Sequence, residues 1–371
     1  MMDFALAELC DQVMTARAGH KPMFIVGGQT KTFYGNTREI TIADGHCLLD
    51  MTVYKGVVDY HPSELVVTVR AGTPLAELQA LLDQERQMLA FEPPHFGPAA
   101  TVGGCVSAGL SGPGRMAYGS VRDFVLGARL LDAQGRLLSF GGEVVKNVAG
   151  YDVSRLLAGA MGTFGALVDV SLKVVPKPAV QCTLCLSATA EQARAQFARW
   201  RVLPLPITAS AWLSDGTPSG GVIWLRLAGS AIGVDSARKA LGGEVVADDQ
   251  AQAFWLSLRE QTHPFFAGEA PLWRLALPPA APISPDLGEQ LIEWGGAQRW
   301  VRGDFSAEDM RTRAEQAGGH ATLFRIAPGG KPPASGVFHP PAPALLSIMQ
   351  RLKNEFDPWH LFNPGRLLPE S

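Results

Sequence analysis

The glycine-rich stretch Pro98-Ala99-Ala100-Thr101-Val102-Gly103-Gly104 continues through Ser107 and Gly109 to Tyr118-Gly119. Glycines let a backbone approach a ligand closely and adopt the positive φ values that turn several N–H groups toward one anion. A second loop of this kind, Gly27-Gly28-Gln29-Thr30, follows an apolar strand at Pro22–Val26. Together the two loops predict a site for the pyrophosphate of a dinucleotide.

Neither loop has the pattern of the common nucleotide-binding folds. Neither reads G-x-G-x-x-G at the start of a long helix, so the usual Rossmann fold is not predicted. Neither reads G-x-x-x-x-G-K-[ST], which argues against a P-loop. A single Gly-Gly pair is more often a tight turn. The prediction therefore depends on the order of all the glycine motifs along the chain.

The other motifs follow in a definite order. They are Tyr118-Gly119 with Arg122-Asp123, then Lys146-Asn147, Tyr151-Asp152, Gly162-Thr163-Phe164-Gly165 and, near the end, Asn363-Pro364-Gly365. This series resembles the FAD-binding domain of the vanillyl-alcohol oxidase superfamily, of the p-cresol methylhydroxylase type, over residues 1–178 and the last ten or so. The segments Val145–Asp152 and Gly319–Arg325 resemble more closely the FAD-binding E subunits of bacterial glycolate oxidases, over the whole chain.

The resemblance implies an α+β protein with a two-part p-cresol methylhydroxylase-type FAD-binding domain and a ferredoxin-like α/β cap domain over the flavin. The two loops would hold the pyrophosphate, the motifs around Gly119 and Gly162 would enclose the adenosine half, and Asn363 would lie near the isoalloxazine ring. The residues implied to bind FAD are Gly27, Gly28, Gln29, Thr30, Pro98, Thr101, Val102, Gly103, Gly104, Ser107, Gly109, Gly119, Ser120, Arg122, Asp123, Gly162, Thr163, Gly165, Val168 and Asn363.

The attachment of the flavin is also implied by the resemblance. Covalent members of the superfamily attach the flavin through a histidine just after the first glycine loop. The corresponding stretch here, Lys31–Gly35, contains neither histidine nor cysteine. FAD is therefore expected to bind without a covalent link.

The domain boundary is predicted at Pro176-Lys177-Pro178, because proline cannot continue a helix or donate a hydrogen bond in a central strand. Residues 1–178 would form the FAD-binding domain, 179–340 the cap, and 341–371 a helix and Asn-Pro-Gly tail that returns to the flavin domain. A helix is expected over 152–160. The cap begins with a β-α-β-β-α run typical of a ferredoxin-like unit, with elements at 180–187, 190–200, 207–213, 221–228 and 231–241. No internal repeat is visible in the sequence.

Composition limits the partners and the compartment. The 371 residues suffice for two domains, and 47% hydrophobic with 18% charged residues is typical of a globular protein. The net charge of -3, without a basic cluster, gives no basis for nucleic-acid binding. Five scattered cysteines and the lack of a signal peptide or long apolar run indicate a cytoplasmic protein. Contact with a membrane is expected only as peripheral association on its inner face.

The oxidation of a 2-hydroxy acid requires a base that takes the hydroxyl proton and a cation that holds the carboxylate. Arg325, after the apolar strand 321–324, is the candidate carboxylate clamp, and His339 is the second candidate. Relatives in the superfamily that oxidise 2-hydroxy acids carry histidine-rich metal clusters. Here His320, His339 and His360 are isolated in sequence, so no metal site is predicted. A structural role for these residues stays open.

The resemblance also implies the reaction and the partners. The chain would be a subunit that oxidises glycolate to glyoxylate and passes electrons to an acceptor other than a nicotinamide. It would work beside a second, larger FAD subunit and an iron–sulfur subunit of the same complex. Two alternatives stay open. The chain could be a non-catalytic subunit that retains FAD for structure or electron transfer, or a stand-alone FAD-linked dehydrogenase of another hydroxy acid.

Overall fold

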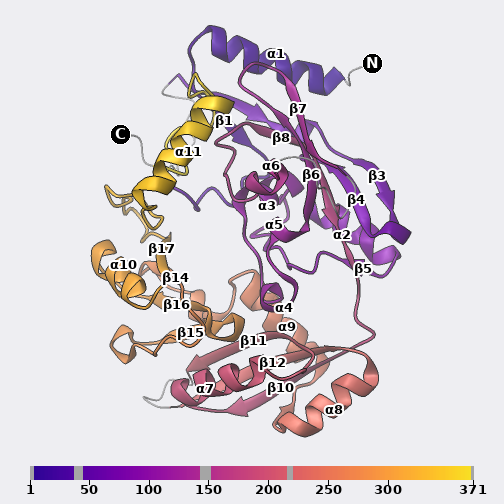
Figure 1. Cartoon of the computed structure of the whole chain (residues 1–371), viewed down its shortest axis with the longest axis vertical. Helices are drawn as coiled ribbons and strands as arrows, with labels where there is room; N and C mark the ends of the chain where they lie inside the picture. Colours follow the sequence, from indigo (N-terminus) through magenta and orange to yellow (C-terminus); the bar gives the residue numbers. More distant parts are fainter. Residues whose placement is uncertain (1–3, 37–44, 143–151, 215–219, 369–371) are drawn as a thin grey trace. The chain divides into compact units, whose positions relative to one another are not determined.

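The computed structural model describes residues 4–36, 45–142, 152–214 and 220–368 (Figure 1). The chain forms two compact units. Unit 1 comprises Met1–Leu110, Ser120–Pro176 and Pro340–Ser371, and unit 2 comprises Ser111–Gly119 and Lys177–His339. The motifs Lys146-Asn147 and Tyr151, which contribute to the resemblance, lie outside the described residues.

Unit 1 is built on a five-stranded antiparallel sheet with the order β3-β4-β8-β6-β7 (Figure 1). Its strands are β3 (Val57–His61), β4 (Val66–Arg70), β6 (Val125–Leu131), β7 (Leu137–Gly141) and β8 (Ala166–Lys173). The central strand β8 is buried along almost its whole length, as expected for a strand covered on both faces. Unit 1 also contains the helices α2 (Leu75–Gln84) and α5 (Val121–Phe124) and the strand pair β5 (Gln87–Met88) and β9 (Val175–Pro176). The helix α4 (Arg115–Tyr118), which precedes α5 in the chain, belongs to unit 2.

A smaller two-stranded sheet carries the first glycine loop. Strand β1 (Met23–Val26) pairs in parallel with β2 (Cys47–Asp50). The helix α1 (Phe4–Ala18) packs its apolar face against this pair, with Leu9 and Val13 in the same buried cluster as Met23 and Leu49. The loop Gly27–Thr30 therefore starts at the end of a firmly packed strand.

The second glycine loop is helical, which the sequence analysis did not predict. Helix α3 (Val102–Ala108) begins after Thr101, whose Oγ1 accepts a hydrogen bond from Gly104 N, and ends at Gly109 with φ 69°. Conversely, the helix predicted over 152–160 was wrong. Only one turn forms, α6 (Val153–Leu156), because the chain enters positive φ at Gly159.

Unit 2 contains one eight-stranded sheet with the order β13-β10-β12-β11-β15-β16-β14-β17. The first half is β10 (Val180–Ser187), α7 (Ala190–Arg201), β11 (Ile207–Ser214), β12 (Gly221–Gly229), α8 (Ala231–Leu241) and β13 (Glu244–Val245). With strands numbered in chain order, the spatial order is 4-1-3-2 and all neighbours are antiparallel. Helices α7 and α8 cover the same face, where Phe197 and Val234 share one apolar cluster (Figure 1). The ferredoxin-like arrangement is thereby confirmed.

The second half of the sheet repeats this arrangement, a relation that the sequence does not reveal. Strands β14 (Leu272–Ala276), β15 (Gln290–Glu293), β16 (Gln298–Arg302) and β17 (His320–Arg325) again have the order 4-1-3-2 and antiparallel pairing. The helix α10 (Ala307–Gln316) occupies the place of the second helix, whereas a loop over 277–289 replaces the first. The two halves join where β11 pairs with β15. Helix α9 (Asp248–Arg259) lies between them in sequence.

The C-terminal tail completes the small sheet of unit 1. Helix α11 (Pro343–Phe356) leads into residues 357–366, and Phe362 forms a parallel bridge with Met23. Met23 N donates to Leu361 O, and Asn363 N donates to Met23 O. Asp357 is fully buried and accepts hydrogen bonds from Leu361 N, Phe362 N and Lys353 Nζ. This bonding fixes the tail beside β1.

The helices give no sign of a bilayer-spanning segment. No helix in the described part of the chain has both the length and the apolar character needed to cross a lipid bilayer.

Candidate functional site

A cavity in unit 1 lies where four separate stretches of the chain meet. The stretches are the end of β1 with its loop, the first turns of α3, the turn at Met161-Gly162, and the C-terminal tail. Its lining residues are Ile25, Val26, Gly27, Gly28, Gln29, Thr30, Lys31, Thr32, Tyr34, Met51, Ala71, Thr101, Gly103, Gly104, Ser107, Ala108, Met161, Gly162, Leu167, Asn363 and Arg366. The cavity thus collects residues that are up to 341 positions apart in the sequence.

The first loop offers backbone donors to this cavity. Within the described part of the chain, the N–H groups of Gly28, Gln29 and Thr30 donate no hydrogen bond. Gln29 has φ 54°, and a left-handed residue within a turn makes successive N–H groups converge on one point. Consecutive unpaired donors at a cavity wall are uncommon, because unpaired polar groups are costly away from water. The loop fits the pyrophosphate of a dinucleotide.

Two glycines of the cavity are required by the space around them. A Cβ on Gly28 would lie 1.5 Å from the carbonyl oxygen of Ala99, so only glycine lets the two loops touch. A Cβ on Gly104 would meet only Thr101 Oγ1, at 3.1 Å, and would otherwise project into open space. Gly104 lines the cavity at the start of α3, so a side chain there would occupy part of the ligand volume.

Asn363 connects the tail to two other walls of the cavity. Its Oδ1 accepts a hydrogen bond from Ile25 N at 2.8 Å, and its Nδ2 donates to Met161 O at 2.6 Å. The residue is buried and adopts φ 44°, which asparagine tolerates better than most residues. Its amide therefore satisfies a strand N–H and a turn carbonyl at once.

Two cationic side chains, Lys31 and Arg366, also line the cavity. Neither was predicted from the sequence. Lys31 is buried and its Nζ donates to His95 O at 3.0 Å. Arg366 Nη2 donates to Lys31 O at 3.2 Å and to Tyr34 O at 3.0 Å. Burial lowers the pKa of Arg366 to about 10, and the guanidinium stays charged at neutral pH. No acidic residue is among the described residues that line this cavity. A positive cavity suits an anionic ligand.

Ten of the residues predicted to bind FAD line this cavity. They are Gly27, Gly28, Gln29, Thr30, Thr101, Gly103, Gly104, Ser107, Gly162 and Asn363. The other ten do not line it: Pro98, Val102, Gly109, Gly119, Ser120, Arg122, Asp123, Thr163, Gly165 and Val168. Gly119 belongs to unit 2, and the remaining nine belong to unit 1.

Several residues of the second group have local structural roles. Ser120 and Asp123 form a capping box at the start of α5, in which Asp123 Oδ2 accepts from Ser120 N at 2.8 Å. Val102 and Val168 are core residues. Thr163 is of another kind, because its buried Oγ1 has no hydrogen-bond partner among the described residues. Nothing in the structure shows a ligand contact for this hydroxyl. The assignment of this group to the adenosine half stays a prediction.

The two candidate catalytic residues lie in unit 2, at opposite ends of β17. Arg325 Nη2 donates to Gln261 Oε1 at 2.8 Å, and burial, with the nearby charge of Arg302, lowers the pKa of Arg325. His339 lies 3.1 Å from Glu315 Oε1 and accepts a long hydrogen bond from Ala321 N. Four residues of extended strand separate Ala321 from Arg325, a distance of about 13 Å.

The histidines of unit 2 approach each other without forming a metal site. The rings of His320 and His339 are 6.2 Å apart between centroids. No group of three or more histidine, cysteine, aspartate or glutamate side chains with metal-binding geometry occurs among residues 4–36, 45–142, 152–214 and 220–368.

Comparison with known proteins now defines the class of this protein. Residues 6–141 match the family model described as FAD binding domain, which covers the first loop and the start of α3. The fold, the glycine-lined cavity and this match define a flavoprotein, and FAD is the cofactor of unit 1. Over 362 residues the chain is 43% identical to glycolate oxidase subunit GlcE of Escherichia coli (strain K12), covering 98% of this chain and 97% of that protein. The chain belongs to the glycolate oxidase subunit GlcE family, which confirms the resemblance seen in the sequence.

More distant relatives match a smaller part of the chain in sequence. Glycolate oxidase subunit GlcD of Bacillus subtilis (strain 168) is 28% identical over 174 residues, which cover 47% of this chain and 36% of that protein. A D-lactate dehydrogenase of Anaerostipes hadrus is 31% identical over 134 residues, covering 36% of this chain and 28% of that protein. The solved structure of an alkyldihydroxyacetonephosphate synthase aligns with a TM-score of 0.67 at 14% identity, over 97% of this chain and 76% of that chain. The structural match shows the shared fold.

Proposed function

We propose that this chain is the FAD-binding subunit of a glycolate oxidase complex, which oxidises glycolate to glyoxylate and passes electrons to an acceptor other than a nicotinamide. The observation that carries the proposal is the 43% identity to a glycolate oxidase subunit over nearly the full length of both chains. The cavity of unit 1, with its unpaired N–H groups and two cations, is the site proposed for FAD.

The residues of the cavity have distinct proposed roles. Gly28, Gln29 and Thr30 hold the pyrophosphate through their N–H groups, and the positive charges of Lys31 and Arg366 balance its charge. Asn363 lies toward the isoalloxazine ring and fixes the wall behind it. FAD, when bound, supplies the acceptor for the two electrons of alcohol oxidation. Since Lys31–Gly35 contains no histidine or cysteine, the flavin is held without a covalent bond.

The substrate is proposed to be held from unit 2. Arg325 binds the carboxylate, for which a planar guanidinium is well suited, and His339 is the candidate to accept the hydroxyl proton. Residues 1–178 act as the FAD-binding domain, 179–340 as the cap and 341–371 as the returning tail.

The partners follow from the family. The names of the relatives divide glycolate oxidase into lettered subunits, and two of these subunits match this chain. We propose that the chain works beside a second, larger FAD subunit and an iron–sulfur subunit. The complex is proposed to be cytoplasmic and to contact the inner face of the cell membrane peripherally.

The test begins with an absorption spectrum of the purified chain, repeated on the supernatant after acid precipitation. Flavin bands in the supernatant are expected, because the cofactor is non-covalent. Anaerobic glycolate is then added to the native protein. Bleaching of the flavin is the expected result for a catalytic subunit. Purification without flavin under every condition would overturn the assignment of the cavity.

A second function has one observation in its favour. Arg325 and His339 lie at opposite ends of β17, and each makes a local contact, with Gln261 and Glu315 respectively. The chain would then retain FAD for structure or electron transfer while a partner binds glycolate. Changing both residues to Ala in the full complex decides between the two. Loss of turnover with assembly intact supports catalysis by this chain, whereas unchanged turnover supports the second function. Dye-linked turnover of another hydroxy acid by the isolated chain would instead support a stand-alone dehydrogenase.

A further inference from the structure

Unit 2 contains a second cavity, separate from the FAD site of unit 1. Its volume is about 470 Å³, within the roughly 300–1,000 Å³ typical of small-molecule sites. Its walls come from α4, the end of α7 and the loop after it, strands β11, β12 and β14, and the turn at Trp294–Gly296. All of these segments belong to unit 2, so the cavity depends on that unit alone.

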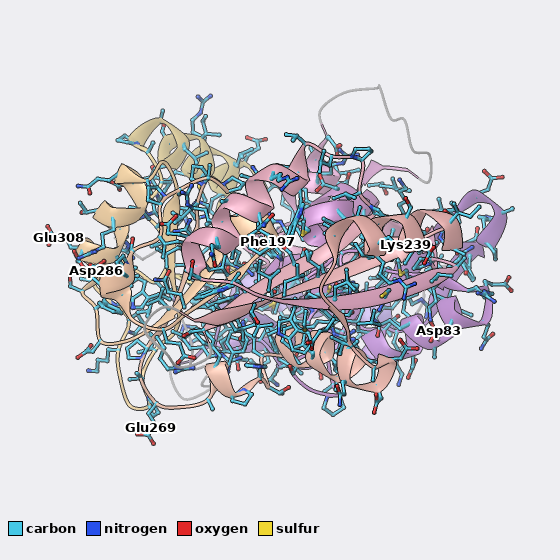
Figure 2. The ribbon with its side chains drawn as sticks, turned by 90° about the horizontal axis from the view of Figure 1, so that it is seen from below. Asp83, Phe197, Lys239, Glu269, Asp286 and Glu308 are labelled. Atoms are coloured by element: carbon cyan, nitrogen blue, oxygen red, sulfur yellow. The ribbon has the colours of Figure 1, made fainter. Side chains whose placement is uncertain are left out.

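The floor of the cavity is apolar and aromatic. Phe197 and Trp200 reach it from α7, with ring centroids 6.1 Å apart in an edge-on arrangement, and Leu225 contributes from β12. All three are buried. Figure 2 labels Phe197 on this helix. An aromatic floor of this kind binds the flat or extended apolar part of a ligand.

The rim of the cavity is cationic. The Arg115 guanidinium lies 4.6 Å from the centroid of the Trp294 ring, and Arg201 Nη2 donates to Gly295 O at 3.0 Å. Both arginines line the cavity, and no Asp or Glu is among its described lining residues. Stacking on an aromatic ring and a backbone hydrogen bond hold the two cationic groups in place. Such a rim recognises a carboxylate or a similar organic anion.

The wall that carries the rim is fixed before any ligand binds. Gly295 N donates to Ser210 Oγ at 2.8 Å, and Trp294 Nε1 donates to Gly112 O at 3.1 Å. Trp294 also adopts φ 53°, a left-handed conformation that is unfavourable for a bulky residue and persists only when its surroundings enforce it. The turn is therefore held in a strained but defined position, and strain of this kind is concentrated at ligand sites.

We propose that this cavity binds a small amphipathic organic anion, with its carboxylate between Arg115 and Arg201 and its apolar body on Phe197, Trp200 and Leu225. Glycolate itself has no apolar body to fill the floor, so the ligand differs from the substrate proposed for the complex. The inference stands on unit 2 and does not require the proposed function of unit 1.

The test is isothermal titration calorimetry of the full flavin-loaded chain with naphthalene-2-carboxylate, compared with the neutral naphthalene-2-carboxamide of the same shape. The carboxylate is expected to bind at least about 10-fold more tightly, because charge-assisted hydrogen bonds contribute more than neutral ones. Equal affinities would overturn the anionic part of the proposal, and the absence of binding by both would overturn all of it.

Three variants locate the binding. The double change Arg115→Gln and Arg201→Gln is expected to weaken carboxylate binding about 10-fold or more and to remove the difference between the two ligands. Ala297→Phe, at the open wall, is expected to block both ligands. Arg199→Gln, an exposed arginine on the same helix that does not line the cavity, is the matched control and should change affinity less than 2-fold. If the first two variants bind as the wild type does, the ligand site lies elsewhere and the proposal fails.

Discussion

The cavity of unit 1 and the region around strand β17 of unit 2 differ in whether backbone groups or side chains form the proposed site. In unit 1, backbone N–H groups, close-fitting glycines and one asparagine define the site. In unit 2, the candidate groups are two side chains: Arg325 at the end of β17, and His339, whose Nδ1 accepts a hydrogen bond from Ala321 N near the start of that strand. A site formed by backbone groups can be recognised in the sequence, because only certain residues permit the required φ values and contacts. Sites formed by side chains depend on which residues the fold brings together, and the sequence alone does not show this.

Each region contains a half-buried arginine, and these two residues make the comparison more specific. Burial lowers the pKa of both Arg366 and Arg325. Arg366 lines the cavity of unit 1 and holds the backbone of the first loop, whereas Arg325 is bonded to Gln261. The pKa values of the two arginines are lowered by the same cause, yet Arg366 is proposed to bind FAD and Arg325 to bind the substrate.

The largest effect is expected from breaking the ion pair that fixes the tail to unit 1. Lys353 Nζ lies 2.6 Å from Asp357 Oδ2, and both side chains are buried. Lys353→Met leaves a buried carboxylate without its cation, which costs about 3–5 kcal/mol of unfolding free energy. Urea unfolding of the flavin-free protein measures this loss.

The matched control is Lys239→Met, which removes a lysine–aspartate pair of the same i,i+4 spacing from an exposed surface, where Lys239 is labelled in Figure 2. It should change the unfolding free energy far less than Lys353→Met does, because solvent screens an exposed ion pair. Equal losses for the two variants would contradict the view that the tail is a structural part of the site.

Contact between the two glycine loops gives the next largest effect. Gly28→Ala places a Cβ 1.5 Å from Ala99 O, so the loops must separate. Overpacking of this kind costs about 1–3 kcal/mol, which corresponds to a roughly 5- to 150-fold weaker FAD affinity if the bound loop needs the contact. Fluorescence titration of the flavin-free protein with FAD measures the affinity. Gly142→Ala, where a Cβ would meet no atom within 4 Å, should bind FAD as the wild type does.

Exchanging the two half-buried arginines for glutamine tests the comparison directly. Arg366→Gln removes two hydrogen bonds to the first loop, from Nη2 to Lys31 O and Tyr34 O. FAD affinity should fall about 10-fold, since a hydrogen bond from a charged group contributes roughly 1.5–3 kcal/mol. Arg325→Gln should leave FAD affinity unchanged. A loss of affinity in the second variant alone would reverse the assignment of the two regions.

The smallest effect concerns the stability of unit 2 below neutral pH. Burial lowers the pKa of His263, whose Nδ1 accepts a hydrogen bond from Phe265 N and caps the turn Pro264–Phe266. A lowered pKa means that the neutral ring stabilises the fold fully above the unfolded pKa of about 6.5, and that this contribution is lost as the pH falls through the folded value. The urea midpoint should therefore decrease between pH 7.5 and 5. His263→Asn, which can cap without titrating, should show a smaller decrease over the same range.

Much of the fold could be predicted from periodicity. Strand β10, helices α7 and α8 and helix α11 are long apolar or amphipathic stretches with clear ends, and their positions agree with the prediction. Helix α3 was missed because it has only seven residues and contains two glycines. Strand β15 was missed because four residues between a proline-rich loop and a glycine pair give too short a pattern.

The repeat in unit 2 and half of the site could not be seen in the sequence. The second ferredoxin-like half lacks its first helix, so the β-α-β-β-α rhythm is broken at 277–289. Lys31 and Arg366 meet across 335 positions, and a single lysine or arginine carries no sign of the cavity it will line. The glycines and Asn363 were foreseen because their roles are set by the backbone.

The hydrogen bond between Ile25 N and Asn363 Oδ1 joins residues 338 positions apart in the chain. It cannot form until residue 363 has been synthesised. A ribosome adding about 5–20 residues per second needs roughly 17–70 s to travel from the first loop to the tail. During that interval β1 and its loop exist without the wall that Asn363 supplies. We therefore expect FAD binding to be completed late, only after residue 363 has been synthesised and has joined β1.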